Sequence, residues 1–390
     1  MEQFRFEHMI RVLLISVLLV TTLGGSAAAQ STLFDQADSL LSIYEEKNLF
    51  SGSVLLAREG EVFTDGYGLA NRSWEIPNTA DTRFQLASLT KPFTATLVLQ
   101  LAERGNLSLN DPISAYLSDY PSGYAADVTI HELLNHTSGI PNYTDFAAWS
   151  DTTSRVDWQP QDFVQIIAER GLEFQPGTRF RYSNSNYYLL GMIIENVTGM
   201  SYSRVLQNQI TRPGRLERTG YLFNRMVVPR MAEGYERLSN GYYEKAPYHS
   251  PSTSYAAGGI FSVVEDLYRW EQLYYNDRLL SEESRTSMMS AGRGNYGYGW
   301  VVGASYPDEV TQFLKNPFTF SSNSRPDRQP YQIQWHWGSN PGFNSLLLRV
   351  PGEQWTIIIL ENQQLAGDPE GTNIFDIAGQ LFQLLHSESG

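Results

Sequence analysis

The chain contains no cysteine among its 390 residues. This absence excludes disulfide bonds, thiolate nucleophiles, cysteine-ligated zinc and a lipid anchor attached through cysteine. Basic residues are also scarce, since 28 lysines and arginines face 42 aspartates and glutamates, which gives a net charge of −14. A surface of this charge repels nucleic acid, so we expect no nucleic-acid partner. The 42% hydrophobic content still allows a substantial core.

Long apolar runs are missing except near the N-terminus, where Val12 to Leu23 follows two arginines. This run is shorter than the roughly 20 residues that cross a bilayer. The small residues Ala27 to Ala29 come next, which is typical of a signal peptide. We therefore expect residues 1–29 to be a signal peptide cleaved after Ala29, and the mature chain to be periplasmic or secreted, with no membrane span. Two glutamates weaken the positive charge of this leader, so an uncleaved anchor or a buried N-terminal helix is the alternative.

Strand-like and helix-like patterns occupy different parts of the chain. The stretch SGSVLLAREGEVFTDGYG near the N-terminus, and IQWHWGSN, NSLLLRV and QWTIIIL near the C-terminus, are typical of strands, whereas the middle is rich in helical spacing. These patterns predict an α+β fold, with an antiparallel sheet from both termini, flanking helices and a helix-rich lobe inserted between the strands. Residues 30–390 would form a single domain, with its sheet lobe at about 33–87 and 290–390 and its helix-rich lobe at about 88–289.

Two apparent cofactor motifs fail on geometry or context. His131 and His136 are five residues apart, which would place them about 140° apart around a helix, whereas a zinc-protease helix needs both on one face. We expect both histidines to be structural. The stretch GRGNYG at 292–297 matches a dinucleotide-binding fingerprint, but no convincing strand precedes it and no helix follows it. The sequence thus predicts neither a metal nor a cofactor.

Ser88 and Lys91 lie three residues apart at the start of the strongest predicted helix, which ends at Gly105. This spacing places the hydroxyl and the amine on one face. Burial and the helix N-terminus would favour a neutral lysine, which can accept the serine proton and activate the nucleophile. Pro92 has no N–H to donate to the Ser88 carbonyl, so we expect the first turn to be irregular or to begin close to Ser88. Alone, the motif is also typical of a helix cap with a surface lysine.

Two further groups of polar residues accompany this pair. Tyr182 and Asn184 lie in a loop before a predicted helix, where a hydroxyl and an amide can point into a cleft. His336 and Gly338 lie on one face of a late predicted strand. A glycine there would allow a substrate backbone to approach the strand closely.

These stretches resemble the serine beta-lactamase-like family, which includes class C beta-lactamases, D-alanyl-D-alanine carboxypeptidases, D-aminopeptidases and related esterases. The resemblance covers about residues 33–361 and follows the family's order through five stretches: DTRFQLASLTKPFTA, LLNHTSGI, FQPGTRFRYSNSNYYLLGMIIENVTG, AAGGIFSVVEDLYRW and HWGSNPGFNS. It implies a beta-lactamase/transpeptidase-like fold and an acyl-enzyme mechanism without a cofactor.

The resemblance also implies roles for individual residues. Ser88 would be the nucleophile, Lys91 its activator and Tyr182 the general base and acid. Asn184 would hold both Lys91 and the substrate amide. The backbone N–H groups of Ser88 and Ser339 would form the oxyanion hole.

His336 and Gly338 match the family's third motif, where beta-lactamases and many peptidases carry a lysine instead of His336. A neutral imidazole grips a substrate carboxylate less well than a permanent cation, so His336 would either donate a hydrogen bond to that carboxylate or shape the pocket. We therefore predict an exported serine hydrolase of ester or amide substrates, D-amino-acid amides included, acting on a small-molecule or peptide-like acyl group. The alternatives are a beta-lactamase or D-alanyl-D-alanine carboxypeptidase, and a non-catalytic penicillin-binding-like protein. The insertion-like segment 305–330 would act as a lid or specificity loop beside the third-motif strand.

Overall fold

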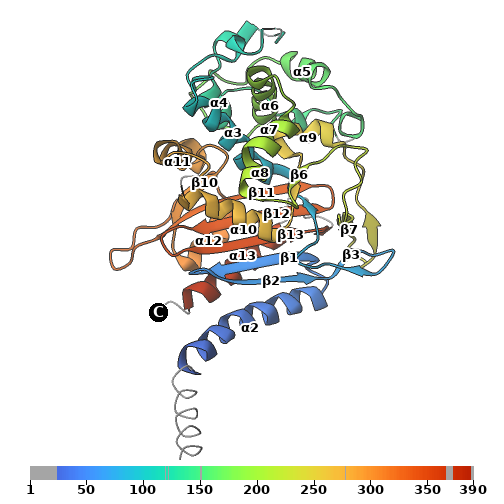
Figure 1. The fold of residues 1–390 in the computed structure, drawn as a ribbon, viewed down its shortest axis with the longest axis vertical. Coiled ribbons are helices and arrows are strands. Elements are labelled where there is room, and N and C mark those ends of the chain that lie inside the picture. The colour runs from blue at the N-terminus through green and yellow to red at the C-terminus, as the bar shows by residue number, and fades with distance from the viewer. Residues whose placement is uncertain are drawn as a thin grey trace, which may run out of the picture.

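The structure is a computed structural model that describes residues 24–118, 120–121, 123–149, 152–276, 278–365 and 372–387 (Figure 1). The apolar run of the expected signal peptide lies outside these residues, and Ala29 falls within α2 (Gly24–Glu46). Cleavage after Ala29 therefore stays a prediction. No helix in the described part of the chain is both long and apolar enough to cross a bilayer.

One six-stranded antiparallel sheet joins the two ends of the chain, in the order β10-β11-β12-β13-β1-β2. Its strands are β1 (Gly52–Arg58), β2 (Glu61–Tyr67), β10 (Val301–Ser305), β11 (Tyr331–Asn340), β12 (Phe343–Val350) and β13 (Trp355–Glu361). The N-terminal β1 pairs with the C-terminal β13 over its whole length, from Gly52↔Glu361 to Arg58↔Trp355. The predicted sheet built from both termini is confirmed.

The sheet has two covered faces because successive side chains of a strand point in opposite directions. Val54 and Leu56 of β1 belong to a core shared with α2, α12 (Val310–Lys315) and α13 (Thr372–Ser387). Leu55 and Ala57 belong to a larger core shared with the remaining helices. Figure 1 shows α2 and α13 on one side of the sheet and the helix-rich part on the other.

The other helices lie between residues 91 and 288 in sequence. They are α3 (Lys91–Glu103), α4 (Ile130–Leu134), α5 (Pro160–Ala168), α6 (Asn184–Thr198), α7 (Tyr202–Leu206), α8 (Arg212–Gly214), α9 (Pro251–Gly258), α10 (Val264–Gln272) and α11 (Glu282–Met288). The short strands are β3 (Leu69–Asn71), β4 (Ile76–Pro77), β5 (Phe84–Gln85), β6 (Gly220–Tyr221), β7 (Tyr235–Arg237), β8 (Tyr243–Lys245), β9 (Ile260–Ser262) and β14 (Gln363–Leu365). Helices α3, α6 and α9 pack against one another, and β11 crosses the turn that precedes α3.

Candidate active site

Ser88 lies in a tight turn rather than in the body of a helix. A 3₁₀ turn covers Ala87–Thr90, the Lys91 N–H donates to the Ser88 carbonyl, and α3 begins at Lys91 with Pro92 in its first turn. Ala87 has φ +46°, a left-handed conformation that is disfavoured for residues with a side chain. The expectation of an irregular first turn close to Ser88 is met, and the turn projects Ser88 toward the cavity that it lines.

The amine of Lys91 is fully buried and has three polar neighbours. Its Nζ lies 2.9 Å from Ser88 Oγ, 2.7 Å from Asn184 Oδ1 and 3.0 Å from the carbonyl oxygen of Ala257. Burial holds the pKa of Lys91 well below its ordinary value. A neutral amine has two N–H groups and one lone pair, so it can donate to Asn184 and Ala257 and accept the Ser88 proton.

Tyr182 completes this group and lies next to both Ser88 and Lys91. Burial raises the pKa of its hydroxyl, and a hydrogen bond to Ser88 acts in the opposite direction. Its ring lies 4.8 Å from Lys91 Nζ and packs against the imidazole of His136, with the ring centres 4.4 Å apart. The structure thus brings Ser88, Lys91 and Tyr182 together with Asn184.

Asn142 orients this group and was not singled out by the sequence. Its Oδ1 accepts hydrogen bonds from the backbone N–H of Asn184 at 3.0 Å and from the Asn184 Nδ2 at 3.2 Å. The amide of Asn184 is thereby turned so that its oxygen faces Lys91. Asn142 follows LLNHTSGI by two residues, so its proximity to a family stretch was the available signal.

The third-motif strand borders the cavity where its neighbour ends. β10 pairs with β11 from Tyr331 to Trp335, and beyond this point Trp337 and Ser339 line the cavity. A Cβ atom on Gly338 would lie 2.1 Å from the Leu86 carbonyl oxygen and 2.6 Å from the Ser88 nitrogen. The glycine therefore allows the protein's own nucleophile turn, rather than a substrate, to approach that face of the strand.

His336 does not line the cavity in this structure. Its side chain is fully buried, with Nδ1 2.6 Å from the Trp337 carbonyl oxygen and Nε2 2.9 Å from the Tyr296 hydroxyl. Burial, reinforced by the nearby Lys91, lowers the pKa of His336 to about 3. The imidazole is thus neutral at pH 7, with its Nδ1–H donating to the carbonyl and Nε2 accepting from Tyr296.

The two other histidines of the sequence analysis hold structural elements in place. His131 Nδ1 lies 2.7 Å from the Tyr298 hydroxyl. His136 Nδ1 lies 3.2 Å from the backbone N–H of Ser183, so this ring supports the loop that carries Tyr182. The described residues include no group of three or more histidines, aspartates or glutamates that could hold a metal ion.

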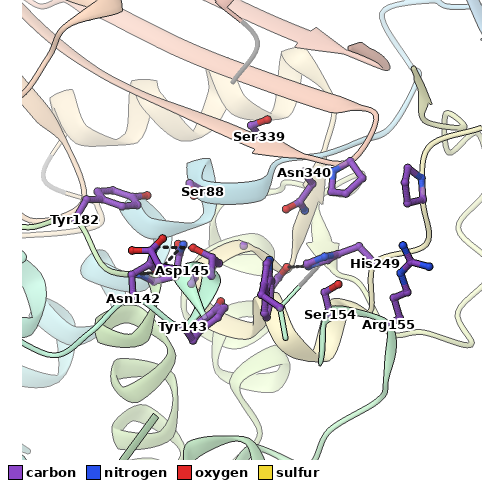
Figure 2. Close-up of a pocket in the computed structure, with 18 of the residues that line it drawn as sticks. Ser88, Asn142, Tyr143, Asp145, Ser154, Arg155, Tyr182, His249, Ser339 and Asn340 are labelled. Atoms are coloured by element: carbon purple, nitrogen blue, oxygen red, sulfur yellow. Dashed lines mark hydrogen bonds between the residues drawn. The ribbon is translucent and has the colours of Figure 1, made fainter. Parts of the chain in front are cut away.

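The cavity at Ser88 has a volume of about 650 Å³ (Figure 2), within the range that holds small-molecule ligands. Aromatic side chains form much of its wall: Tyr143, Trp149, Tyr182, Tyr248, Phe318 and Trp337. Phe318 comes from the insertion-like segment that joins β10 to β11, and its ring stacks on Tyr182 with centres 5.8 Å apart. This segment therefore reaches the cavity through one aromatic ring.

The comparison with known proteins agrees with this geometry. The profile of the family described as Beta-lactamase matches residues 35–380. The chain belongs to the beta-lactamase family. Within it, the chain is 31% identical to Penicillin-binding protein 4* of Bacillus subtilis (strain 168) over 349 residues, which are 84% of this chain and 71% of that protein. The family resemblance predicted from the sequence is confirmed.

Solved structures of this family share the fold. A D-stereospecific amidohydrolase from Streptomyces sp. is 26% identical, with a TM-score of 0.66 over 83% of this chain and 92% of that chain. A D-amino acid amidase from Ochrobactrum anthropi SV3 is 25% identical, with a TM-score of 0.71 over 90% of this chain and 99% of that chain. Family members thus include amidases and penicillin-binding proteins.

Proposed function

We propose that the protein hydrolyses an ester or amide through an acyl-enzyme formed on Ser88. The observation that carries this proposal is the environment of Lys91, whose Nζ is buried and lies 2.9 Å from Ser88 Oγ, and whose pKa is held well below its ordinary value by that burial. In a neutral amine, the two other contacts of Nζ, to Asn184 and Ala257, would use its N–H groups and leave the lone pair for Ser88. A serine hydroxyl is a poor nucleophile until such a base takes its proton.

The proposed cycle transfers one acyl group and consumes one water. Ser88 Oγ attacks the substrate carbonyl while its proton passes to Lys91, and the N–H groups of Ser88 and Ser339 stabilise the oxyanion. Tyr182 then donates its proton to the leaving alcohol or amine and regains one from Lys91. Since burial raises the pKa of Tyr182, this hydroxyl enters the cycle protonated, which suits a general acid. Water releases the acyl group from Ser88 by the reverse proton path.

The neutral charge at the third motif supports the proposed substrate class. His336 is buried and neutral, so the position that would grip a beta-lactam or peptide carboxylate carries no cation. This favours ester or amide substrates over beta-lactams and over D-alanyl-D-alanine peptides. The similarity to a D-stereospecific amidohydrolase and to a D-amino acid amidase supports D-amino-acid amides as members of the substrate class.

A fluorophosphonate probe followed by mass mapping tests the nucleophile. We expect labelling of Ser88, loss of labelling and turnover in Ser88→Ala, and full labelling in Ser154→Ala, which removes another hydroxyl from the wall of the same cavity. Unchanged turnover in Ser88→Ala would refute the proposal. Parallel kinetics on nitrocefin, p-nitrophenyl butyrate and D-alanyl p-nitroanilide then rank the substrate classes, with nitrocefin expected to be the poorest.

The second candidate function is penicillin binding without turnover, which the 31% identity to Penicillin-binding protein 4* favours. It predicts stable acylation of Ser88 by penicillin and no hydrolysis of any member of the panel. Intact-mass measurement of the protein after incubation with penicillin distinguishes the two candidates, because turnover regenerates the free enzyme.

We also propose that the protein is exported. The support is the leader pattern in residues 1–29. N-terminal mass analysis of the secreted or periplasmic protein should find a chain that begins after Ala29, and an intact leader on the mature protein would contradict this.

A further inference from the structure

One exposed basic side chain of the cavity wall has no ion pair within the part of the chain that the structure describes. Among the described residues that line it, Asp145 and Arg155 are the acidic and basic side chains. Asp145 pairs with Arg181 at 3.2 Å, whereas no ion pair of Arg155 occurs in the described part of the chain. The imidazole of His249, also in the wall, has its pKa lowered to about 4 by burial and is neutral at pH 7.

The backbone holds Arg155 at this place. Arg155 ends the short helix Thr153–Arg155, and its neighbour Ser154 is buried and anchored on both sides. The Ser154 N–H donates to Trp149 at 3.0 Å, and its carbonyl accepts from the Ser250 N–H at 2.7 Å. The carboxylate two residues away, Asp157, instead accepts hydrogen bonds from Ser250 and Asn224.

The position of Arg155 relative to Tyr182 tells which part of a substrate it can meet. In Figure 2, Arg155 and His249 lie across Ser88 from Tyr182. In the proposed cycle Tyr182 protonates the leaving group, so the opposite arm of the cavity receives the acyl group. Arginine presents a planar fork of N–H donors that matches a carboxylate.

We infer that the acyl group transferred to Ser88 carries a carboxylate at its far end, and that Arg155 binds it. This inference rests on the proposed hydrolase function and specifies its substrate class. It differs from carboxylate binding at the third motif, because Arg155 lies on the acyl side of Ser88 and His336 carries no charge.

Matched pairs of p-nitrophenyl esters test the inference. One series consists of p-nitrophenyl monoesters of succinic, glutaric, adipic and pimelic acids, each with a free carboxylate at the far end. The other consists of p-nitrophenyl esters of neutral acyl chains of the same length. We expect wild type to prefer the carboxylate ester at one or two chain lengths. Arg155→Gln should lower the carboxylate-to-neutral ratio of kcat/KM by about 10- to 100-fold, the range for a hydrogen bond to a charged group. Arg155→Lys should retain part of the ratio, and 0.5 M NaCl should reduce it in wild type.

Arg225→Gln is the control, since Arg225 is an exposed arginine outside the cavity wall and its loss changes the net charge equally. This variant should keep the wild-type ratio. Equal ratios in wild type and Arg155→Gln, with Ser88-dependent turnover of both series, would overturn the inference and leave the hydrolase proposal standing.

If the hydrolase proposal is wrong, the result differs, because wild type then hydrolyses neither series of esters. Calorimetric binding of the intact esters to Ser88→Ala then decides the inference. Tighter binding of the carboxylate esters, lost in Arg155→Gln combined with Ser88→Ala, supports it, and equal binding of both series overturns it.

Discussion

Gly338 of β11 faces the nucleophile turn so closely that a Cβ atom on it would lie 2.6 Å from the backbone nitrogen of Ser88. The same Cβ atom would lie 2.1 Å from the carbonyl oxygen of Leu86. Both neighbours belong to the backbone, so neither can move aside as a flexible side chain can. The contact therefore fixes the distance between the turn that carries Ser88 and the strand that carries Ser339.

Gly338→Ala should separate this strand from the turn and misplace the two N–H groups proposed to hold the oxyanion. We expect kcat/KM to fall by about 100-fold or more, since a misplacement of about 1 Å can have this effect, together with a lower Tm. The control is Gly352→Ala in the β12–β13 turn, where a Cβ atom meets nothing within 4 Å. A Gly338→Ala enzyme with nearly wild-type kcat/KM would show that the strand does not set the oxyanion geometry.

Tyr182→Phe should affect substrates according to their leaving group. An amine must be protonated before it leaves, whereas p-nitrophenolate leaves readily without a proton. We therefore expect the variant to lose about 10²- to 10⁴-fold in kcat/KM, which reports acylation alone, for D-alanyl p-nitroanilide or an alkyl amide, and far less for p-nitrophenyl butyrate. Tyr306→Phe, which alters a tyrosine outside the cavity wall, should change neither. Equal losses on ester and amide would argue against Tyr182 as the general acid.

Two histidines with lowered pKa values, the buried His336 and the partly buried His249, make the folded protein sensitive to acid. The pKa is lowered from an ordinary value of 6.5 to about 3 for His336 and to about 4 for His249. Between these values and 6.5 the unfolded chain binds more protons than the folded protein. The contribution of the two histidines to the free energy of unfolding is therefore complete above pH 6.5 and is lost as the pH drops. The slope is about 1.4 kcal/mol per pH unit for each such group.

Urea unfolding at pH 7.0, 5.5 and 4.5 measures this dependence. We expect His249→Gln to reduce the loss of stability between pH 6.5 and 4.5, because glutamine does not titrate. For wild type and for the variant, the free energy of unfolding at each pH is compared with that of the same protein at pH 7.0. Parallel pH curves for the two proteins would contradict the assignment of His249 as a partly buried neutral group.

The parts of the site that could be predicted from sequence are those with a local pattern. Helix geometry predicts that Ser88 and Lys91 lie close together and that Pro92 belongs to the first turn. Strand geometry likewise predicts β1 and β13 from the residues that form them. The sheet from both termini could be predicted because its strands are long and apolar.

The rest depends on contacts between distant segments, which leave little local signal. Ala257 contributes only a backbone carbonyl to Lys91, and every residue type has one. His336 was expected on the same strand face as Gly338, but its burial and its bond to Tyr296 come from tertiary packing. Asn142 and Arg155 acquire their roles through loops whose course no periodicity reveals.

The three partners of the Lys91 amine also determine what a covalent probe of Ser88 reports. Asn184 is 93 residues and Ala257 is 166 residues away from Lys91 in the chain. The amine is held for proton transfer only after these distant segments have met, and closing loops of this length costs conformational entropy. Reaction at Ser88 thus counts molecules in which the segments that carry Lys91, Asn184 and Ala257 have folded together, so active-site titration of a purified sample would measure the fraction with an assembled site.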